Sequence, residues 1–507
     1  MNYLLGIDLG TSGTKTVLFD EKGTAIASHS IEYPIIQIQN GWAEQDAHLW
    51  WEATVQTIQK VLKDSKISPE SVKGVGISGQ MHGLVLLDKN GEVLRNSIIW
   101  CDGRTSAECA EITEKIGAKR LIEITANPAL TGFTAGKILW VRKHEPEIYA
   151  KTVQILLPKD YVRYKLTGIF ATDVSDASGM NLLDLGKRDW SAEIFEKLDL
   201  DPTLFPKVYE SPDVIGKITP EISKLTGLST ETVVVAGAGD NAAAAVGMGV
   251  VEEGKAFTTI GTSGVVFAHS NQISIDPEGR VHTFGAAVPN AYTVMSCTLS
   301  AGLSLKWMRD TLCQSEVAQA KKEGCDPYEI MTEEAKSSPI GANHLLFMPY
   351  LMGERSPILD EKARGCFIGL SAIHNKNDLI RAVMEGVIYS QKHCLDVLEE
   401  MNVAPETMLA CGGGGTSPLW RQMLADVFAC PVATAENQQG PALGVAILAG
   451  VGAGIYPSVA EGCKAVLSFK EAQNPIPENT EKYGKFYEIY RELYPCLKET
   501  YLKLAEL

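Results

Sequence analysis

Residues 6–15 read Gly-Ile-Asp-Leu-Gly-Thr-Ser-Gly-Thr-Lys, and they join two short apolar runs, residues 3–7 and 16–19, that are typical of β-strands. Two such runs connected by a polar loop bounded by glycines predict a β-hairpin. The loop has little side-chain bulk, so its backbone N–H groups can approach an anion. Asp8, at the mouth of the loop, is suited to hold a hydrated Mg²⁺ beside that anion. An ordinary hairpin with an exposed aspartate explains this stretch equally well.

The core of this loop recurs about half a chain later. Residues 260–265 read Ile-Gly-Thr-Ser-Gly-Val, again between β-prone runs, residues 256–260 and 265–268. A four-residue match arises easily by chance, but a match in the same strand–loop–strand context indicates two related domains. We therefore expect each domain to offer one phosphate-binding hairpin to a shared cleft.

Length and charge restrict the class of protein. A chain of 507 residues exceeds what a single hydrophobic core usually holds, so two or three domains are expected. The net charge of −16 argues against a nucleic acid or an anionic membrane surface as the main partner. The sequence shows neither a secretory signal nor a long apolar segment, so a cytoplasmic location is expected.

Two polar loops follow strand-like runs in the first quarter of the chain, where α/β folds place ligand contacts. Residues 79–83 read Gly-Gln-Met-His-Gly after the β run 72–78. His82 is either a structural imidazole or a group that binds a substrate hydroxyl, and its glycine neighbours favour the second interpretation. Residues 100–104, Trp-Cys-Asp-Gly-Arg, suit either a bound polyol or a local ion pair.

Asp240 stands in the middle of the chain on a turn made of small residues. A buried-type strand at 232–236 and the residues Gly-Ala-Gly at 237–239 precede it, and an alanine-rich helix follows. Aspartate is a favoured helix N-cap, which is one explanation. The small residues on both sides also clear space for a ligand, which a plain cap does not need, and the two roles are compatible.

The second half contains a run of four glycines. Residues 411–417 read Cys-Gly-Gly-Gly-Gly-Thr-Ser, between a strand at 408–410 and a helix that begins at Pro418. A flexible linker is the other interpretation of four glycines, and the strand and helix that adjoin the run directly argue against it. We expect a turn whose bare backbone lets a flat nucleoside lie against it, with Ser417 reaching a hydroxyl or ring nitrogen. The charged stretch 310–339 is expected to be peripheral.

Two phosphate hairpins, a nucleoside loop and an open-faced aspartate together indicate a phosphotransferase assembled across a cleft. The P-loop pattern GxxxxGK[ST] and the protein-kinase motifs are absent from the sequence. The phosphate cradle is therefore expected to be of the double-hairpin type.

These motifs resemble the FGGY family of carbohydrate kinases along essentially the whole chain. The resemblance is carried by residues 77–83, 100–104, 132–141, 157–161, 237–241 and 353–357. It implies an α/β fold of two duplicated ribonuclease H-like domains of the actin/hexokinase-like ATPase type, flanking a central cleft. The implied domains are residues 1–247, which bind the sugar, and residues 248–507, which bind adenosine.

Within that family, the resemblance implies that ATP phosphorylates D-xylulose to D-xylulose 5-phosphate. The loop at 79–83 is the pointer, because relatives that act on glycerol carry Arg-Glu in place of Met81-His82. Gluconate, ribulose or L-xylulose is the alternative substrate. A non-catalytic actin-like ATPase or sugar sensor is a more distant alternative. Such a protein needs no base in the sugar cleft, so the presence of Asp240 argues against it. The partners implied are the sugar and ATP, and family analogy adds a homodimer.

The resemblance also implies roles for individual residues. Asp240 is the expected general base on the terminal hydroxyl of the sugar, and Asp8 is the expected Mg²⁺ anchor, through water. The residues expected to contact the sugar are Gln80, Met81, His82, Asp240 and Asn241. The residues expected to contact ATP are Thr11, Ser12, Thr262, Gly302, Lys306, Gly413, Gly414 and Ser417.

Overall fold

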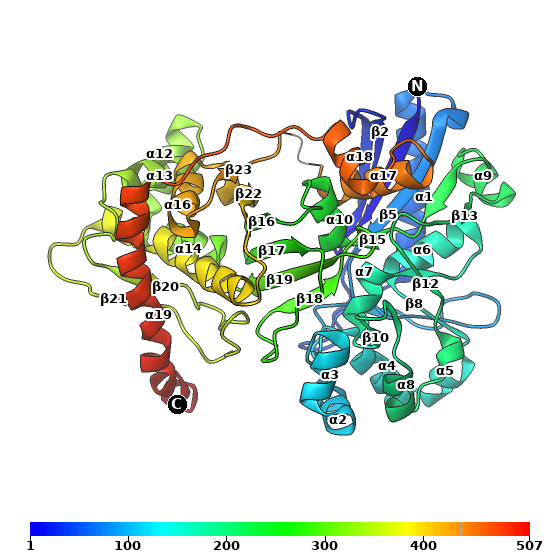
Figure 1. Cartoon of the computed structure of the whole chain (residues 1–507), viewed down its shortest axis with the longest axis horizontal. Coiled ribbons are helices and arrows are strands. Elements are labelled where there is room, and N and C mark those ends of the chain that lie inside the picture. Colours follow the sequence, from blue (N-terminus) through cyan, green and yellow to red (C-terminus); the bar gives the residue numbers. More distant parts are fainter. Residues whose placement is uncertain (437–438) are drawn as a thin grey trace.

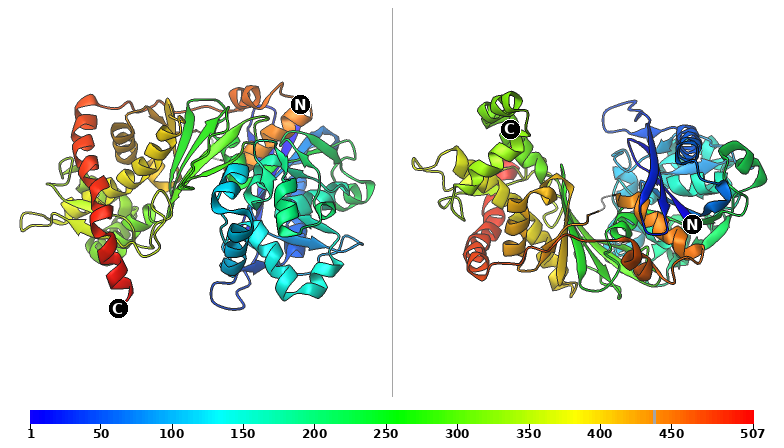
Figure 2. Two further views of the ribbon diagram at one scale, coloured as in Figure 1. Left: turned by 60° about the horizontal axis from the view of Figure 1, so that its bottom comes forward. Right: turned by 90° about the horizontal axis from the view of Figure 1, so that it is seen from above.

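The computed structural model of the chain describes residues 1–436 and 439–507. It has two lobes, each built on a mixed β-sheet with helices packed on its faces (Figure 1). The N-terminus lies in the first lobe and the long C-terminal helix in the second, as two further views show (Figure 2). Among the described residues, no helix is both long enough and apolar enough to cross a membrane.

The first lobe contains the predicted opening hairpin. Strands β1 and β2 pair antiparallel, and β1 pairs on its other side with β5 in parallel, so that Asp8 lies between Lys15 and Ser78. The strand order is β13-β14-β5-β1-β2-β3, with β15 also paired to β5. The strands are β1 (Tyr3–Leu9), β2 (Gly13–Asp20), β3 (Ala25–Glu32), β5 (Val72–Gly79), β13 (Val214–Lys217), β14 (Val233–Val235) and β15 (Ala238–Gly239).

The second lobe repeats this arrangement around the second hairpin. Its strand order is β18-β19-β17-β16-β22-β23, in which β16, β17 and β19 run antiparallel and β22 and β23 continue in parallel beyond β16. The strands are β16 (Lys255–Ile260), β17 (Gly264–Ser270), β18 (His282–Gly285), β19 (Tyr292–Thr298), β22 (Thr407–Cys411) and β23 (Val432–Ala433). A hairpin and third strand on one side, with two parallel strands on the other, is the order of the first sheet too, as the predicted duplication requires.

Helices cover both sheets. The helices that bear on the site in the first lobe are α1 (Ala47–Ser65), α4 (Thr134–His144), α6 (Pro158–Thr167), α7 (Val174–Ala177) and α10 (Asp240–Gly247). Those of the second lobe are α11 (Gly302–Leu312), α12 (Gln314–Glu323), α13 (Pro327–Lys336), α14 (Lys376–Glu400), α15 (Gly412–Thr416), α16 (Pro418–Phe428) and α19 (Pro477–Ala505). Helix α1 begins after Asp46, whose carboxylate caps it by accepting a hydrogen bond from the backbone N–H of His48 at 2.9 Å.

Two late helices return to the first lobe, α17 (Gly440–Gly452) and α18 (Val459–Val466). Helix α17 packs against β1, β5 and α10 (Figure 1), and its side chains share one apolar core with residues of β1 and α10. The approach is so close that a Cβ on Gly444 would lie 1.8 Å from the carbonyl oxygen of Ala243. The second half of the chain therefore builds part of the first lobe, beside the turn that carries Asp240.

The glycine run forms a short helical turn between β22 and α16. Residues 412–416 form the short helix α15, and Pro418 then starts α16. Arg421 stabilises this turn, because its Nη1 donates to the carbonyl oxygens of Gly415 at 3.0 Å and Thr416 at 2.9 Å. The helical turn is short, and Gly413 and Gly414 remain on the wall of the pocket described below.

Candidate active site

Asp8 lies near the end of β1, at the mouth of the first hairpin. The hydroxyl of Ser78 donates to its Oδ1 at 2.7 Å. Burial raises the pKa of Asp8, while the Ser78 hydrogen bond and the charge of Lys15 oppose that rise. Its second oxygen, Oδ2, makes no hydrogen bond within residues 1–436 and 439–507, so it can take a further ligand.

The first hairpin loop is held by side chains from three other segments. Thr11 Oγ1 donates to Gln80 Oε1 at 3.2 Å and accepts from Trp100 Nε1 at 2.9 Å. Gln80 is buried, and its amide nitrogen donates to Gln45 Oε1 at 2.7 Å. The structure thus brings Thr11 and Gln80 into direct contact, and leaves the side chain of Ser12 exposed.

His82 adopts an uncommon backbone conformation, with φ at +70°. Its Nδ1 lies 2.8 Å from the carbonyl oxygen of Gly179, which can only accept, so Nδ1 carries the proton and Nε2 is an acceptor. Burial lowers the pKa of His82 well below its usual value, and the charge of Lys137 lowers it further. The imidazole is therefore neutral and keeps an acceptor nitrogen for a hydroxyl group.

Lys137 holds the loop at residues 79–83 in place. The sequence analysis did not identify this residue. It lies fully buried on α4, where its Nζ donates to the carbonyl oxygens of His82 at 2.8 Å and Gly132 at 2.7 Å. Thr134 Oγ1 donates to the same His82 oxygen at 3.1 Å. Burial lowers the pKa of Lys137 to about 7. The available signal was a lysine placed directly before the apolar run at residues 138–141.

Asp240 is the first residue of α10, and the N-cap position belongs to Gly239, so Asp240 is not the plain helix cap. Its Oδ1 accepts from the backbone N–H of Asn241 at 2.7 Å and from Asn241 Nδ2 at 3.2 Å. Burial raises the pKa of Asp240 to about 7, and the negative charge of Asp8 contributes to the rise. The two carboxylates, far apart in sequence, thus interact electrostatically.

Met81 connects the turn that carries Asp240 to the loop at residues 79–83, which is the candidate sugar-binding loop. A Cβ on Gly239 would lie 2.9 Å from Met81 Cγ, and a Cβ on Gly179 would lie 2.5 Å from the ring of His82. Met81 is buried, so it forms an apolar wall between the Asp240 turn and the His82 loop. The structure therefore places Met81, His82, Asp240 and Asn241 around one region of the first lobe.

Residues 100–104 form a local ion pair, which was one of their two interpretations, rather than an open polyol site. Asp102 and Arg104 form a buried ion pair, with Nη2 and Oδ2 2.7 Å apart, and Arg104 also contacts Glu44 at 2.8 Å. The guanidinium lies 3.7 Å from the ring centre of Trp42. These charges satisfy one another, and only Trp100 reaches the hairpin loop, through Thr11.

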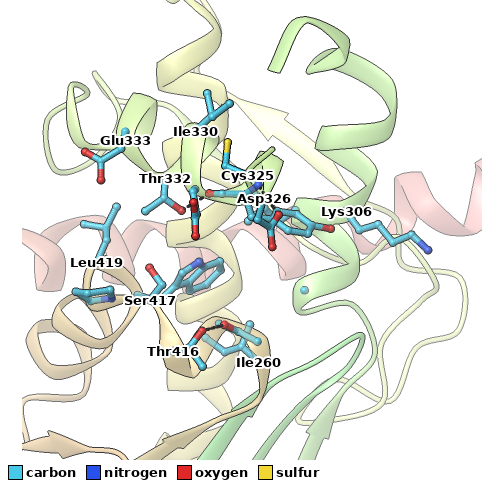
Figure 3. Close-up of a pocket in the computed structure, with 18 of the residues that line it drawn as sticks. Ile260, Lys306, Cys325, Asp326, Ile330, Thr332, Glu333, Thr416, Ser417 and Leu419 are labelled. Carbon is cyan, nitrogen blue, oxygen red and sulfur yellow. Dashed lines mark hydrogen bonds between the residues drawn. The ribbon is translucent and has the colours of Figure 1, made fainter. Parts of the chain in front are cut away.

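The second lobe holds a pocket of about 1040 Å³ (Figure 3). Its walls include six of the residues expected to contact ATP: Thr262, Gly302, Lys306, Gly413, Gly414 and Ser417. The hydroxyl of Ser417 is buried and has no hydrogen-bond partner among the described residues, so it is free to meet a ligand. Thr11 and Ser12 lie in the first lobe, away from this pocket.

The charged stretch 310–339 is not peripheral, contrary to expectation. Residues of α12 and α13 form the wall opposite the glycine turn, and Figure 3 shows Thr332 and Asp326 on the same pocket as Ser417. The buried residues of α13, Met331 and Ala335, lie on a different part of the helix from those that line the pocket, and α13 contacts α14. That contact has no local sequence pattern.

Known proteins match the chain over its whole length. Residues 3–247 match the N-terminal domain, and residues 256–453 the C-terminal domain, of the FGGY family of carbohydrate kinases. A xylulose kinase from Bacillus subtilis is 39% identical over 98% of both chains. A gluconokinase from Bacillus licheniformis is 30% identical over 99% of this chain and 98% of its own.

A solved structure shares the fold. The crystal structure of a xyloylose kinase from Brucella ovis superposes with a TM-score of 0.90 at 34% identity, and the match covers 98% of this chain and all of that one. The predicted fold, two duplicated domains of the actin/hexokinase-like ATPase type, is confirmed. With both family domains matched in order, this chain belongs to the FGGY family of carbohydrate kinases.

Proposed function

We propose that this kinase transfers the γ-phosphoryl group of ATP to the terminal hydroxyl of D-xylulose, giving D-xylulose 5-phosphate and ADP. The observation that carries the proposal is the placement of a half-buried carboxylate, Asp240, beside the Met81–His82 loop. The relative named xylulose kinase, similar over its full length, supports the choice of sugar.

Asp240 is the general base of this proposal. An ionised carboxylate accepts the proton of the sugar hydroxyl as the new O–P bond forms, which is worth roughly 10²–10⁴-fold in rate. A pKa of about 7 leaves a substantial fraction of Asp240 ionised at neutral pH and makes it a stronger base than an exposed aspartate. The remaining acceleration comes from in-line positioning and neutralisation of phosphate charge.

The sugar is held by groups with defined polarity. The Nε2 of His82 accepts a hydrogen bond from a sugar hydroxyl, since its Nδ1 is already used on Gly179. Asn241 offers its amide beside Asp240, and Met81 covers the apolar edge of the sugar. Gln80 contributes indirectly, because it ties this loop to Thr11 of the phosphate hairpin.

ATP is proposed to span the two lobes. The nucleoside occupies the second-lobe pocket, where Ser417, Gly302 and Lys306 line the wall, and α13 closes the far side. The phosphates meet the backbone N–H groups of the two hairpin loops, residues 10–13 and 261–264. Thr262 lines the pocket beside the second of these loops.

Asp8 is the residue proposed to hold Mg²⁺. No cluster of three or more His, Cys, Asp or Glu ligands exists in the described part of the chain, so a closed protein cage is not what this site offers. Mg²⁺ in kinase sites is usually held by one or two carboxylates with phosphates and waters, and the open Oδ2 of Asp8 fits that pattern. When bound, Mg²⁺ neutralises charge on the transferring phosphate.

Gluconate is the second candidate substrate, favoured by the gluconokinase that matches the whole chain. We also propose a domain boundary at residues 247/248, where α10 ends and the chain first crosses towards β16. Helices α17 and α18 return later to the first lobe.

We further propose that the protein forms a homodimer. Light scattering on the purified protein measures this oligomeric state.

The test is ADP release from Mg-ATP across a panel of ketoses, aldoses, polyols and gluconate, with wild type and Asp240→Asn. We expect D-xylulose to give the highest kcat/KM, and Asp240→Asn to lose at least a hundredfold in kcat with little change in KM for ATP. A higher kcat/KM for gluconate or glycerol would refute the choice of sugar. Near-normal kcat in Asp240→Asn would remove Asp240 as the base.

A further inference from the structure

The turn that carries Asp240 is anchored by contacts to three of its backbone groups, at Ala236, Gly237 and Gly239. Arg163 Nη1 donates to the carbonyl oxygen of Ala236 at 2.6 Å. The backbone N–H of Gly237 donates to the carbonyl oxygen of Ser211 at 3.1 Å. The backbone N–H of Gly239, directly before Asp240, donates to Ser175 Oγ at 3.1 Å.

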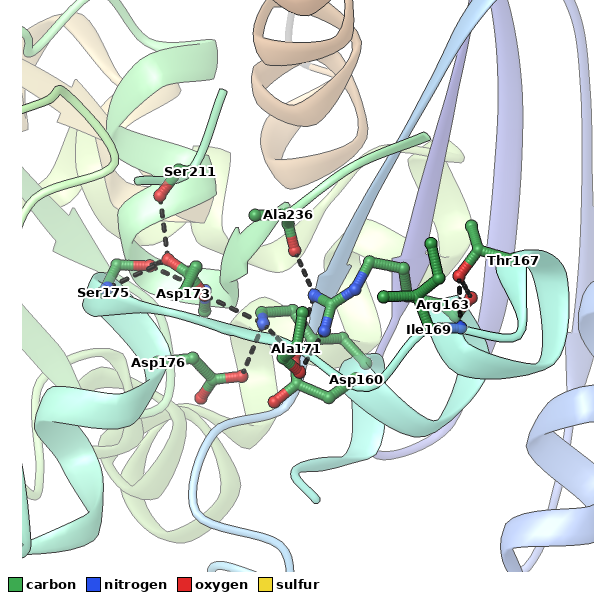
Figure 4. A network of polar contacts seen from close by, with 12 residues as sticks. Asp160, Arg163, Thr167, Ile169, Ala171, Asp173, Ser175, Asp176, Ser211 and Ala236 are labelled. Atoms are coloured by element: carbon green, nitrogen blue, oxygen red, sulfur yellow. Dashed lines mark hydrogen bonds and ion pairs between the residues drawn. The ribbon is translucent and has the colours of Figure 1, made fainter. Parts of the chain in front are cut away.

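These anchors belong to one buried network behind the turn (Figure 4). Asp173 is its hub: its Oδ2 accepts from Ser175 Oγ at 2.6 Å and from Ser211 Oγ at 2.8 Å, and its Oδ1 pairs with Lys159 Nζ at 2.8 Å. Asp160 joins the two cations, at 2.6 Å from Lys159 and 3.0 Å from Arg163. All these side chains are almost completely buried.

The charges of the network balance. Lys159 and Arg163 supply two positive charges, and Asp160 and Asp173 supply two negative ones. The third carboxyl, Asp176, is buried as well, and its Oδ2 lies 3.5 Å from Lys159 Nζ. Burial raises the pKa of Asp176 well above its usual value, and the charge of Lys159 opposes that rise.

A buried ion network of this kind is not in itself a strong source of stability. Removing two charges from water costs several kcal/mol per ion, which good geometry only offsets. Its geometric effect is clearer: a salt-bridged carboxylate orients the Ser175 hydroxyl, and the hydroxyl fixes the peptide next to Asp240.

We propose that Asp173 and Ser175 are positioning residues, which hold the peptide of Gly239 so that Asp240 meets the sugar hydroxyl. The inference rests on the proposed role of Asp240 as the base. The Ser175 hydroxyl donates its proton to Asp173 and accepts a hydrogen bond from the backbone N–H of Gly239, so it links Asp173 directly to the peptide next to Asp240.

The chain offers a matched pair of variants, Ser175→Ala and Ser211→Ala. Each removes one buried hydroxyl that donates to Asp173 Oδ2, at 2.6 Å and 2.8 Å. Only Ser175→Ala also removes the acceptor of the Gly239 N–H, because the contact of Ser211 with Gly237 is made by its backbone oxygen. The two variants are thus alike in the network and differ at the turn.

Steady-state kinetics and Tm are measured for both variants, with Asp240→Asn as reference. We expect similar drops in Tm, a fall of tenfold or more in kcat for Ser175→Ala alone, and KM for ATP within twofold of wild type in both. Equal kcat in the two variants overturns the positioning role. If Asp240→Asn itself keeps its activity, the proposed base fails instead, so the two failures are distinguishable.

Discussion

Asp240→Asn should make the kinase inactive and yet more stable at alkaline pH. The raised pKa means that the folded protein holds the Asp240 proton more tightly than the unfolded chain does. Ionising Asp240 in the folded state works against burial and the charge of Asp8, so the native protein loses stability as pH rises from about 4 to about 7. Asparagine has nearly the same shape and cannot ionise, so the variant escapes this loss.

The magnitude follows from the shift from 3.8 to about 7. At about 1.4 kcal/mol per pKa unit, the full loss is about 4 kcal/mol, complete above pH 7. Part of it has occurred by pH 5, because the unfolded chain ionises near its ordinary value. Between pH 5 and pH 8 the wild type should therefore lose about 3 kcal/mol relative to Asp240→Asn.

Tm is measured at pH 5 and pH 8 for wild type, Asp240→Asn and a control, Asp64→Asn, which removes an exposed carboxylate on α1. We expect the Tm of Asp240→Asn to rise relative to that of the wild type between pH 5 and pH 8. The Tm of Asp64→Asn should change with pH in parallel with the wild type. The kcat/KM of the wild type should also fall as pH drops below about 7, since a protonated Asp240 cannot act as a base. Parallel Tm profiles for wild type and Asp240→Asn would refute the reasoning.

Two further substitutions test the packing around the site. Lys137→Met removes both hydrogen bonds from Nζ to the carbonyl oxygens of His82 and Gly132, so KM for the sugar should rise tenfold or more with KM for ATP unchanged. Lys143 is exposed on the same helix, and the control Lys143→Met should behave as wild type in steady-state kinetics. Gly444→Ala forces a Cβ against Ala243 and should cost about 1–3 kcal/mol. Gly484→Ala, with open space around it on α19, should add about 0.5–1 kcal/mol, and calorimetry compares the two; equal changes in Tm would contradict the close contact.

Local sequence was enough wherever a residue's role depends on its chain neighbours. Both hairpins could be predicted, because alternating β-prone runs and glycine-bounded turns are short-range signals. The start of α1 at Asp46 follows from a side chain two residues away. The position of Asp240 on a small-residue turn before a helix was also readable, although its N-cap alternative needed the structure to be excluded.

Tertiary structure decided every feature that depends on residues distant in the sequence. The interaction of Asp8 with Asp240 arises only when β1 and β15 join β5 in one sheet. The expectation for residues 310–339 was wrong because a charged helix looks the same from the sequence whether or not one edge faces a pocket.

The sequence by itself thus determined the two phosphate hairpins and the aspartates that stand near them, since strand, turn and cap propensities act over a few residues. The structure decided which groups carry charge and where they point. The Lys159–Asp173 pair and the shifted pKa values of Asp176 and Lys137 result from burial and from partners distant in the sequence. Desolvation and Coulomb energies depend on three-dimensional distance, and no local pattern in the chain records it.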